Sequence, residues 1–226
     1  MIKHGQLDRV VVGGVDALSK FTFNGFNTLM ILDREWCKPF DENRKGLNLG
    51  EAAAFLVIEG ENALNLRKGK ALAEVVGYAN ANDAYHQTAS SPEGYGATLA
   101  ITQALAMSGL APSQIDYINM HGTGTPNNDL SESMATKAVF GDNVPKFSST
   151  KAFTGHTLAA AASIEAVISV LSLQNSMIFP NLNFTTPIAD MNLIPETQLV
   201  NTPLNTILSN SFGFGGNCSS LIFKKA

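Results

Sequence analysis

Charged residues are scarce in this chain of 226 residues: aspartate, glutamate, lysine and arginine make up 15% of it, against 45% hydrophobic residues. Because so few charges leave little to solvate a surface, we expect a large buried area or a large contact with another chain. The net charge is −4 and there is no run of basic residues, which argues against a nucleic-acid partner.

Cysteine is nearly absent, since Cys37 and Cys218 are the only two. Two isolated cysteines form no disulfide framework and have no metal-ligand spacing, so we expect no metal site. The sequence shows no secretory signal, and its longest apolar stretch, residues 158–173, is interrupted by three serines and a glutamate. We therefore expect a cytoplasmic protein with no part in a membrane.

Short apolar runs alternate with helical patterns along the chain. Strands are predicted at residues 10–12 (ended by Gly13 and Gly14), 53–58, 73–78, 115–120, 146–149, 207–212 and 220–223. Helices are predicted at residues 61–67, 96–108 (closed by Gly109), from a cap at Asn128 or Asp129 to residue 140, and 156–174. Residues 19–50 are predicted to be irregular, and a connection of that length is usually a functional loop or a lid. This alternation predicts an α/β chain with a mixed sheet between helix layers.

Three segments carry side chains suited to chemistry. The first, residues 121–126, reads HGTGTP and follows a predicted strand. Loops at strand ends commonly carry catalytic groups in α/β folds, and the glycines let the backbone come close to a ligand. His121, Thr123 and Thr125 are therefore candidates, although a polar turn with a satisfied histidine fits the same pattern.

The second segment, residues 148–156, reads SSTKAFTGH and leads into the longest helical pattern. His156 is expected in the first turn of that helix, where the positive helix end keeps the ring neutral. A neutral histidine can donate a hydrogen bond to a developing oxyanion, but a histidine at a helix start is often structural. Glu165 lies in an apolar helix and needs a partner. Lys151 is either that partner or an ordinary surface lysine.

The third segment, residues 211–217, reads SFGFGGN. Phe214 lies among Gly213, Gly215 and Gly216, which together make a flexible loop with a bulky side chain. Such a loop can gate a pocket, and a plain hairpin turn fits the same residues.

Taken together, and in this order, the three segments resemble the C-terminal half of the β-ketoacyl-acyl carrier protein synthases, the condensing enzymes of fatty acid and polyketide synthesis. Residues 12–18 (VGGVDAL), 38–41 (KPFD) and 46–51 (GLNLGE) also resemble that family, in the same order. The resemblance runs from Gly5 to Lys225. Each motif is weak alone, whereas six in register are specific.

The resemblance implies a thiolase-like fold, in which two similar α/β halves pack as an αβαβα layered sandwich. Residues 1–18 are then expected to be the end of the N-terminal half, and residues 19–226 the C-terminal half. In the reaction that it implies, a cysteine of the first half takes an acyl group from a carrier protein as a thioester. Malonyl-carrier protein loses carbon dioxide, and the resulting carbanion attacks that thioester.

Residue by residue, the resemblance matches the two histidines of the family with His121 and His156, which are implied to promote decarboxylation and stabilise the enolate. Lys151 matches the family lysine, with an electrostatic role, and Glu165 matches the helix glutamate near the site. The residues implied to contact the substrate or its phosphopantetheine arm are Thr123, Thr125, Phe214 as an aromatic gate, Gly213 and Gly215.

The chain departs from the family because the nucleophilic cysteine and its motif are absent. Neither cysteine matches it: Cys37 precedes the 38–41 motif, and Cys218 stands in the stretch after the glycines, which differs from the Thr-Asn usual in the family. A smaller departure is AAA at residues 160–162, where the family often carries a glycine. We therefore expect that the chain condenses nothing without the N-terminal half.

The resemblance implies three partners: an acyl carrier protein, the N-terminal half of the synthase, and a second subunit in a homodimer or heterodimer. It implies no metal and no cofactor, because the substrates are carried on the phosphopantetheine of the carrier protein. Two alternatives stay open. One is a non-catalytic partner subunit akin to a chain-length factor, and the other is a module that binds acyl-carrier or coenzyme A groups without chemistry.

Overall fold

The computed structural model describes all 226 residues, Met1–Ala226. Its body is a five-stranded sheet in the order β3-β9-β8-β4-β5. The strands are β3 (Glu74–Asn82), β4 (Tyr117–Asn119), β5 (Lys146–Ser148), β8 (Thr206–Gly213) and β9 (Asn217–Lys224). Because β4 runs parallel to β5 and β8, whereas β9 runs antiparallel to β3 and β8, the predicted mixed sheet is confirmed.

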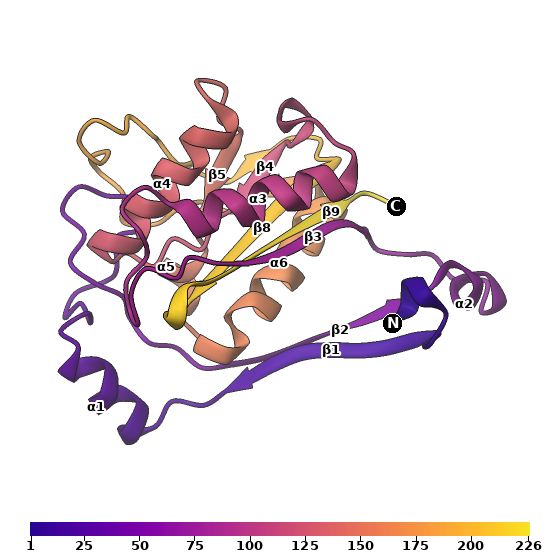
Figure 1. Cartoon of the computed structure of the whole chain (residues 1–226), viewed down its shortest axis with the longest axis horizontal. Helices are drawn as coiled ribbons and strands as arrows, with labels where there is room; N and C mark the ends of the chain where they lie inside the picture. Colours follow the sequence, from indigo (N-terminus) through magenta and orange to yellow (C-terminus); the bar gives the residue numbers. More distant parts are fainter.

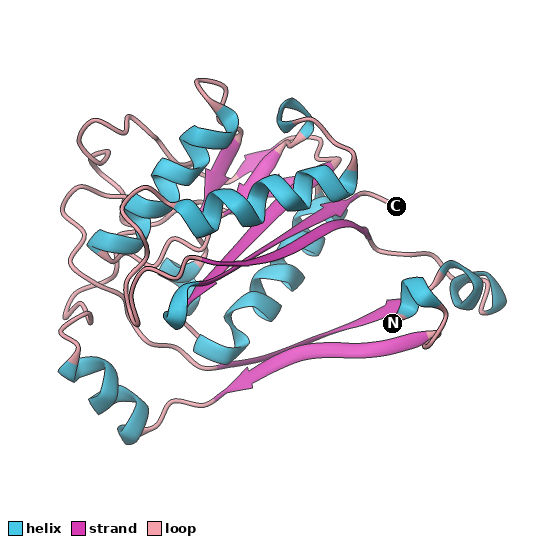
Figure 2. Cartoon of the chain, in the orientation of Figure 1, coloured by secondary structure: helices cyan, strands magenta, loops and turns pink.

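Helices cover both faces of this sheet (Figures 1 and 2). On one face, α3 (Tyr95–Ser108) and α4 (Pro126–Phe140) share a buried cluster with the sheet residues Ile118, Leu208 and Ile222. On the other face, α6 (Ala161–Asn175) packs against Tyr117, Ile207 and Phe223, each of which is adjacent in sequence to one of those three sheet residues. Adjacent residues of each strand thus serve opposite helix layers, as the two-residue period of a strand requires.

One segment, Leu158–Asn175, is long and apolar enough to cross a membrane by length and composition. Half of it is buried inside the structure, where α6 packs against β2 and β8. Core helices pass the same test, so packing against the sheet accounts for the apolar character of this segment.

Two strands form a separate antiparallel ribbon, β1 (Arg9–Asp16) with β2 (Ala52–Glu59). The prediction that Gly13 and Gly14 end the first strand is wrong, because β1 runs through both. A Cβ at Gly14 would lie 2.2 Å from the carbonyl oxygen of Ala159, so this glycine lets the ribbon approach the body closely. The side chain of Asp16 strengthens the contact by accepting the Ala159 N–H at 3.1 Å.

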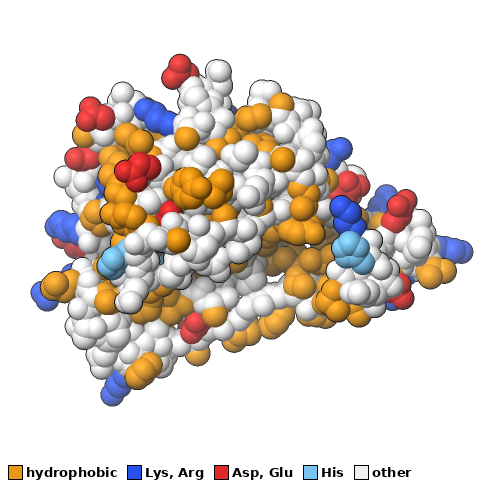
Figure 3. Space-filling model, viewed as in Figure 1, with side chains coloured by type: hydrophobic (Ala, Val, Ile, Leu, Met, Phe, Trp, Pro, Cys, Tyr) orange, Lys and Arg blue, Asp and Glu red, His pale blue; other side chains and the backbone are white.

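The outer face of the ribbon is apolar and exposed. Val11 pairs with Val57 across the two strands, and Gly13 pairs with Phe55. The side chains of Val11, Phe55 and Val57 are each more than half exposed. Figure 3 shows hydrophobic side chains along this arm of the molecule. A face of this kind normally packs against another layer.

The prediction that residues 19–50 are irregular is wrong for its first part, where α1 (Lys20–Thr28) forms. The Oγ of Ser19 caps this helix by accepting the Thr22 N–H at 3.1 Å. The stretch after α1 is irregular as predicted, and backbone bonds such as Leu47 N–H to Ile31 O hold it to itself.

The remaining elements are short: η1 (Ile2–His4), α2 (Glu61–Leu66), η2 (Pro112–Gln114), α5 (Lys151–Thr154), η3 (Leu158–Ala160), β6 (Met177–Ile178), β7 (Val200–Asn201) and η4 (Phe214–Gly216). The predicted cap of α3 is confirmed, since Gly109 has φ 69°. The predicted cap of α4 is wrong, because its cap is Thr125, followed by Pro126 in the first helical position.

Candidate active site

The predicted polar segments meet at one edge of the main sheet. His121 follows β4, Lys151 follows β5, and Phe212 belongs to β8, which is parallel to β4. Carboxyl ends of parallel strands share an edge, and loops that leave this edge bring distant residues together. His121 and Lys151 are both buried there.

Lys151 and Glu165 form a buried ion pair. The Nζ of Lys151 also donates to the carbonyl oxygen of His121 at 2.5 Å and lies 3.2 Å from its Nδ1. All three ammonium protons of Lys151 thus have acceptors. The predicted contact with Glu165 is confirmed, and the alternative of a surface lysine is wrong. Burial raises the pKa of Glu165 to about 7, against the opposing attraction of Lys151.

The neighbour of His121 determines its tautomer. A lysine ammonium has only donors, so the Nδ1 of His121 must accept from Lys151. Burial holds the pKa of His121 well below its ordinary value, with the charge of Lys151 as a second cause. The ring is therefore neutral, and its proton lies on Nε2.

His156 does not lie in a helix, which corrects the prediction for this residue. It lies between α5 and η3, and the long helix α6 begins only at Ala161. The backbone N–H of His156 donates to Asn48 O at 2.7 Å, and its carbonyl accepts from Gly50 N–H at 3.1 Å. The 46–51 segment therefore positions His156.

The imidazole of His156 is nevertheless neutral, for a reason other than a helix end. Burial lowers its pKa to about 3, and the charge of Lys151 adds to this effect. The N–H of Leu158 points at Nδ1 at 3.2 Å, so this nitrogen must be the acceptor. The proton of His156 is therefore also on Nε2.

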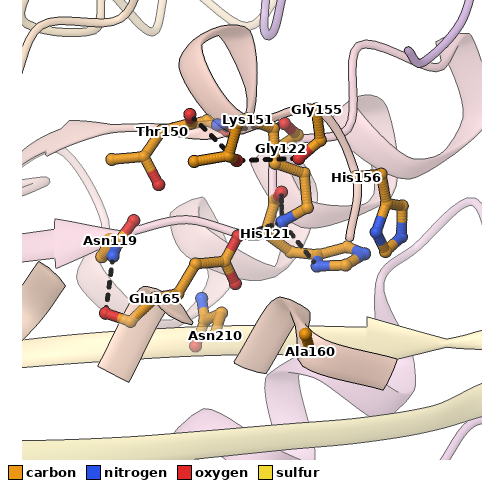
Figure 4. A network of polar contacts seen from close by, with 12 residues as sticks. Asn119, His121, Gly122, Thr150, Lys151, Gly155, His156, Ala160, Glu165 and Asn210 are labelled. Carbon is orange, nitrogen blue, oxygen red and sulfur yellow. Dashed lines mark hydrogen bonds and ion pairs between the residues drawn. The ribbon is translucent and has the colours of Figure 1, made fainter. Parts of the chain in front are cut away.

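The two imidazoles lie together, with ring centroids 5.2 Å apart and planes at 83° (Figure 4). Each ring has its Nδ1 engaged as an acceptor and its Nε2–H left as a donor. Two preorganised neutral donors in a buried site suit one oxygen atom on which negative charge develops.

Sequence analysis missed Glu132 of α4, which is fully buried beside this pair. Its two carboxylate oxygens accept the N–H groups of His121 at 3.0 Å and Gly122 at 2.8 Å, and Asn210 donates to it at 3.2 Å. Burial raises the pKa of Glu132 to about 7, opposed by these hydrogen bonds. A carboxylate eleven residues after a candidate histidine, on the next helix, was the available signal.

A second carboxylate, Asp129, which the sequence suggested only as a helix cap, joins two of the sequence motifs. It accepts the N–H of Phe40, in the 38–41 motif, at 2.8 Å and that of Gly124, in the 121–126 segment, at 3.1 Å. The guanidinium of Arg44 donates to the carbonyl oxygens of Thr125 and Pro126 in the same place. The irregular stretch thus fixes the backbone around His121.

Thr123 and Thr125 lie next to this network. Their hydroxyl oxygens are 2.9 Å apart, and Thr125 also caps α4. The glycine between them has φ 81°, a conformation that L side chains rarely adopt. The structure thus accounts for the local geometry of both threonines, and their role toward phosphopantetheine stays a prediction.

The glycine loop consists of Gly213, the last residue of β8, and η4 (Phe214–Gly216), which leads into β9. The ring of Phe212, at the base of this loop, is 5.5 Å from that of His121. Phe214 is about half exposed at the tip. The loop therefore borders the histidine pair, and the gating role of Phe214 stays a prediction.

Neither cysteine is an activated thiol. Cys218 is buried on β9 opposite Phe212, and burial raises its pKa to about 12. Cys37 is buried too, with its pKa raised by burial. Because thiolates are the nucleophilic form, both environments oppose nucleophilic catalysis.

Comparison with known proteins identifies the family. The beta-ketoacyl synthase N-terminal domain matches residues 1–63, and the beta-ketoacyl synthase C-terminal domain matches residues 72–185. Among curated relatives, 3-oxoacyl-[acyl-carrier-protein] synthase 2 of Staphylococcus aureus (strain COL) is 37% identical over 235 residues, covering 100% of this chain and 56% of the relative.

The mitochondrial 3-oxoacyl-[acyl-carrier-protein] synthase of Arabidopsis thaliana is 40% identical over 237 residues, covering 99% of this chain and 51% of the relative. One similar solved structure is a type II PKS acyl-carrier protein in complex with its ketosynthase bound to the hexaketide. It has a TM-score of 0.95 and 32% identity, and covers 100% of this chain and 58% of that chain.

The fold is accordingly that of the thiolase-like ketosynthases. This chain spans about half the length of the curated relatives that it matches. Two domains of one family match successive parts of it, and the relatives match over nearly all of it. The chain belongs to the β-ketoacyl synthase family.

Proposed function

We propose that this chain is the histidine-bearing part of a β-ketoacyl-acyl carrier protein synthase, a condensing acyltransferase of fatty acid or polyketide biosynthesis. The proposed reaction is the decarboxylative condensation of malonyl-carrier protein with an acyl thioester. The observation that carries the proposal is the pair of buried neutral imidazoles, His121 and His156, each with a free Nε2–H donor.

In the proposed decarboxylation, the bond between the malonyl carboxylate and its methylene carbon breaks. Carbon dioxide leaves, and the electron pair moves into an enolate whose charge gathers on the thioester oxygen. The Nε2–H groups of His121 and His156 stabilise that oxygen by hydrogen bonding. Because both donors are neutral and fixed by their Nδ1 partners, little reorganisation is needed as the charge forms.

Lys151 is proposed to act on this step through position and charge. Its ammonium holds the Nδ1 of His121 and is itself held by Glu165. A fixed positive charge behind the ring keeps the imidazole neutral and orients its Nε2–H. Glu132 is a positioning residue from the other side, since it binds the backbone N–H of His121.

The acyl-accepting cysteine is proposed to come from the part of the synthase that the relatives have beyond this chain. Supporting this, Cys37 and Cys218 are both buried with raised pKa values. The ribbon of β1 and β2 is the proposed contact for that part, because each of its strands has one unpaired edge and its outer face is apolar. The division into an N-terminal part at residues 1–18 and a C-terminal part at 19–226 stays a prediction.

The proposed partners are an acyl carrier protein and a second synthase subunit, in a homodimer or heterodimer. A solved relative is named as a ketosynthase in complex with an acyl-carrier protein, which supports the first. Thr123, Thr125 and Phe214 are the proposed contacts for the phosphopantetheine arm, and the chemistry uses protein side chains without a metal or cofactor. Location in the cytoplasm stays a prediction, since one relative is named as mitochondrial.

The test uses this chain combined with a cysteine-bearing N-terminal part from a relative, and it follows release of carbon dioxide from malonyl-carrier protein. His121→Ala and His156→Ala should each slow decarboxylation by about 10²- to 10³-fold, the loss expected for one oxyanion donor. His86→Ala, at an exposed histidine, is the matched control. Unchanged decarboxylation in both variants contradicts the proposed role.

Absence of decarboxylation in the unaltered assembly, with carrier protein still bound, would favour the alternative of a non-catalytic partner or binding module. Condensation by the purified chain alone would contradict the proposal that the nucleophile lies elsewhere. Mass spectrometry of the assembled protein after incubation with acyl-carrier protein locates the acyl group directly.

A further inference from the structure

The glycine loop between β8 and β9 has two kinds of contact that hold it. On one side, the N–H of Gly215 donates to Gln87 O and the carbonyl of Gly216 accepts from Asp83 N–H, both at 2.8 Å. The side-chain amide of Asn82 also donates to Gly215 O at 2.9 Å. These backbone bonds tie the loop to the segment that follows β3.

On the other side, the only aromatic contact of the loop tip is with α1. The rings of Phe26 and Phe214 are stacked, with centroids 5.8 Å apart and planes at 21°. The two residues are 188 positions apart in sequence, and neither belongs to the main hydrophobic cluster.

The helix α1 has few other attachments. None of its residues is buried, and Phe21 and Phe23 are exposed. Figure 1 shows it beyond the end of β1, apart from the helices that cover the sheet. The residues that precede α1 are anchored by the backbone N–H of Leu18, which donates to the carboxylate of Glu51 at 2.9 Å. Because α1 is otherwise loosely attached, the stack with Phe214 is a main contact for both partners.

The space around the loop differs between its two glycines: a Cβ at Gly216 would lie 3.0 Å from Ala84 N, whereas Gly215 faces open space. Gly215 and Gly216 both have φ 79°, and a Cβ added at Gly215 would meet no atom within 4 Å. The tip is therefore unconfined on that side. At its base is Phe212, whose ring lies 5.5 Å from His121. The conformation of the tip thus bears on the immediate surroundings of the histidine pair.

We propose that Phe26 is a latch: by stacking on Phe214 it holds the glycine loop in its observed conformation, and α1 thereby controls access beside the histidine pair. Only the link to access rests on the proposed function. Opening of the loop itself is measurable without any reaction, so failure of the latch and failure of the proposed function are distinguishable.

The experiment is amide hydrogen exchange of the 226-residue chain with single-residue resolution. Phe26→Ala should raise the exchange rate of the Gly215 amide by about 2- to 13-fold, the factor that corresponds to loss of one aromatic pair. Phe23→Ala is the matched control, because it makes the same change in the same helix at an exposed ring. Phe26→Tyr keeps the aromatic face and should restore the slow rate.

The coupling must be reciprocal, so Phe214→Ala should raise the exchange of the Phe23 amide, which donates to Ser19 O, by a similar factor. Equal rates at Gly215 in the unaltered chain and in Phe26→Ala would overturn the proposal. A rise as large in Phe23→Ala as in Phe26→Ala would overturn it too, because it would reflect general loosening of α1. If Phe26→Ala does not fold, Phe26→Leu and the reciprocal Phe214→Ala measurement decide the question.

Discussion

The protonation state of His156 predicts a specific dependence of stability on pH. Burial and the charge of Lys151 lower its pKa to about 3 in the folded chain, whereas an unfolded histidine has a pKa of about 6.5. His156→Asn removes the titrating group and keeps a side-chain oxygen that can accept the N–H of Leu158. The difference between the unaltered chain and this variant therefore isolates the ring.

The sign follows from which state binds the proton. Below pH 6.5 the unfolded chain protonates this ring and the folded chain does not, so the contribution of His156 is complete above pH 6.5 and is lost as pH falls toward 3. At pH 5, which is about 1.5 pH units below the pKa of the unfolded histidine, this ring lowers the free energy of unfolding by about 2 kcal/mol. Below pH 3 the reduction reaches about 5 kcal/mol.

Two buried carboxylates act in the opposite direction. The pKa values of Glu132 and Glu165 are raised to about 7, so their contribution to stability is present below pH 4.5 and is lost as pH rises through 7. Both groups are present in the unaltered chain and in His156→Asn. Their effects cancel in the difference, which is why the comparison and not the absolute curve is the measurement.

The assay is urea unfolding at pH 7, 6 and 5. Between pH 7 and pH 5, the free energy of unfolding of the unaltered chain should fall by about 2 kcal/mol more than that of His156→Asn. His86→Asn, at an exposed histidine, reports the effect of removing a surface imidazole. Equal losses in the chain and in His156→Asn, within about 0.5 kcal/mol, would refute the assignment. Nitrogen NMR that finds the proton of the neutral His156 ring on Nδ1 would refute the assigned tautomer.

Three further results are expected. Lys151→Met should lower the free energy of unfolding in urea by about 3–5 kcal/mol, because Glu165 stays buried without its cation. Adding Glu165→Leu should recover much of this loss. A double variant no more stable than Lys151→Met would contradict the pairing. Cys218 should react with iodoacetamide at least about 100-fold more slowly in the folded chain than in urea, and rapid labelling of the folded chain would show that the thiol is neither buried nor of raised pKa. Gly155→Ala should lower the free energy of unfolding by about 1–3 kcal/mol, since Gly155 has φ 67° and an added Cβ would lie 2.8 Å from Gly50 N. An unchanged free energy of unfolding in the same assay would disprove the close approach.

Much of this architecture could be predicted from the sequence because it rests on local patterns. The strands of the main sheet are short apolar runs, and α3 ends at a glycine as its pattern indicates. The meeting of His121 with Lys151 follows from where β4 and β5 end. The ion pair with Glu165 follows from the cost of an unpaired carboxylate in an apolar helix.

The remainder depends on contacts between distant residues. His156 looks like the start of a helix, but bonds from Asn48 and Gly50, about a hundred residues earlier, hold its backbone in another conformation. The neutral ring was predicted for the wrong reason, because burial and not a helix end lowers its pKa. The strand β1 continues through Gly13 and Gly14 because the body approaches closely there, which no local pattern reveals.

The part of the molecule that needs a partner is not the part that holds the two histidines. The outer face of the ribbon exposes Val11, Phe55 and Val57, so the predicted need for a further contact falls on β1 and β2. The acceptors of Lys151, by contrast, all lie on His121 and Glu165 within this chain. The tautomers of both histidines are therefore determined without a partner. The pH dependence predicted for His156 should hold in the chain alone, whereas condensation, as proposed, needs the part of the synthase that covers the ribbon.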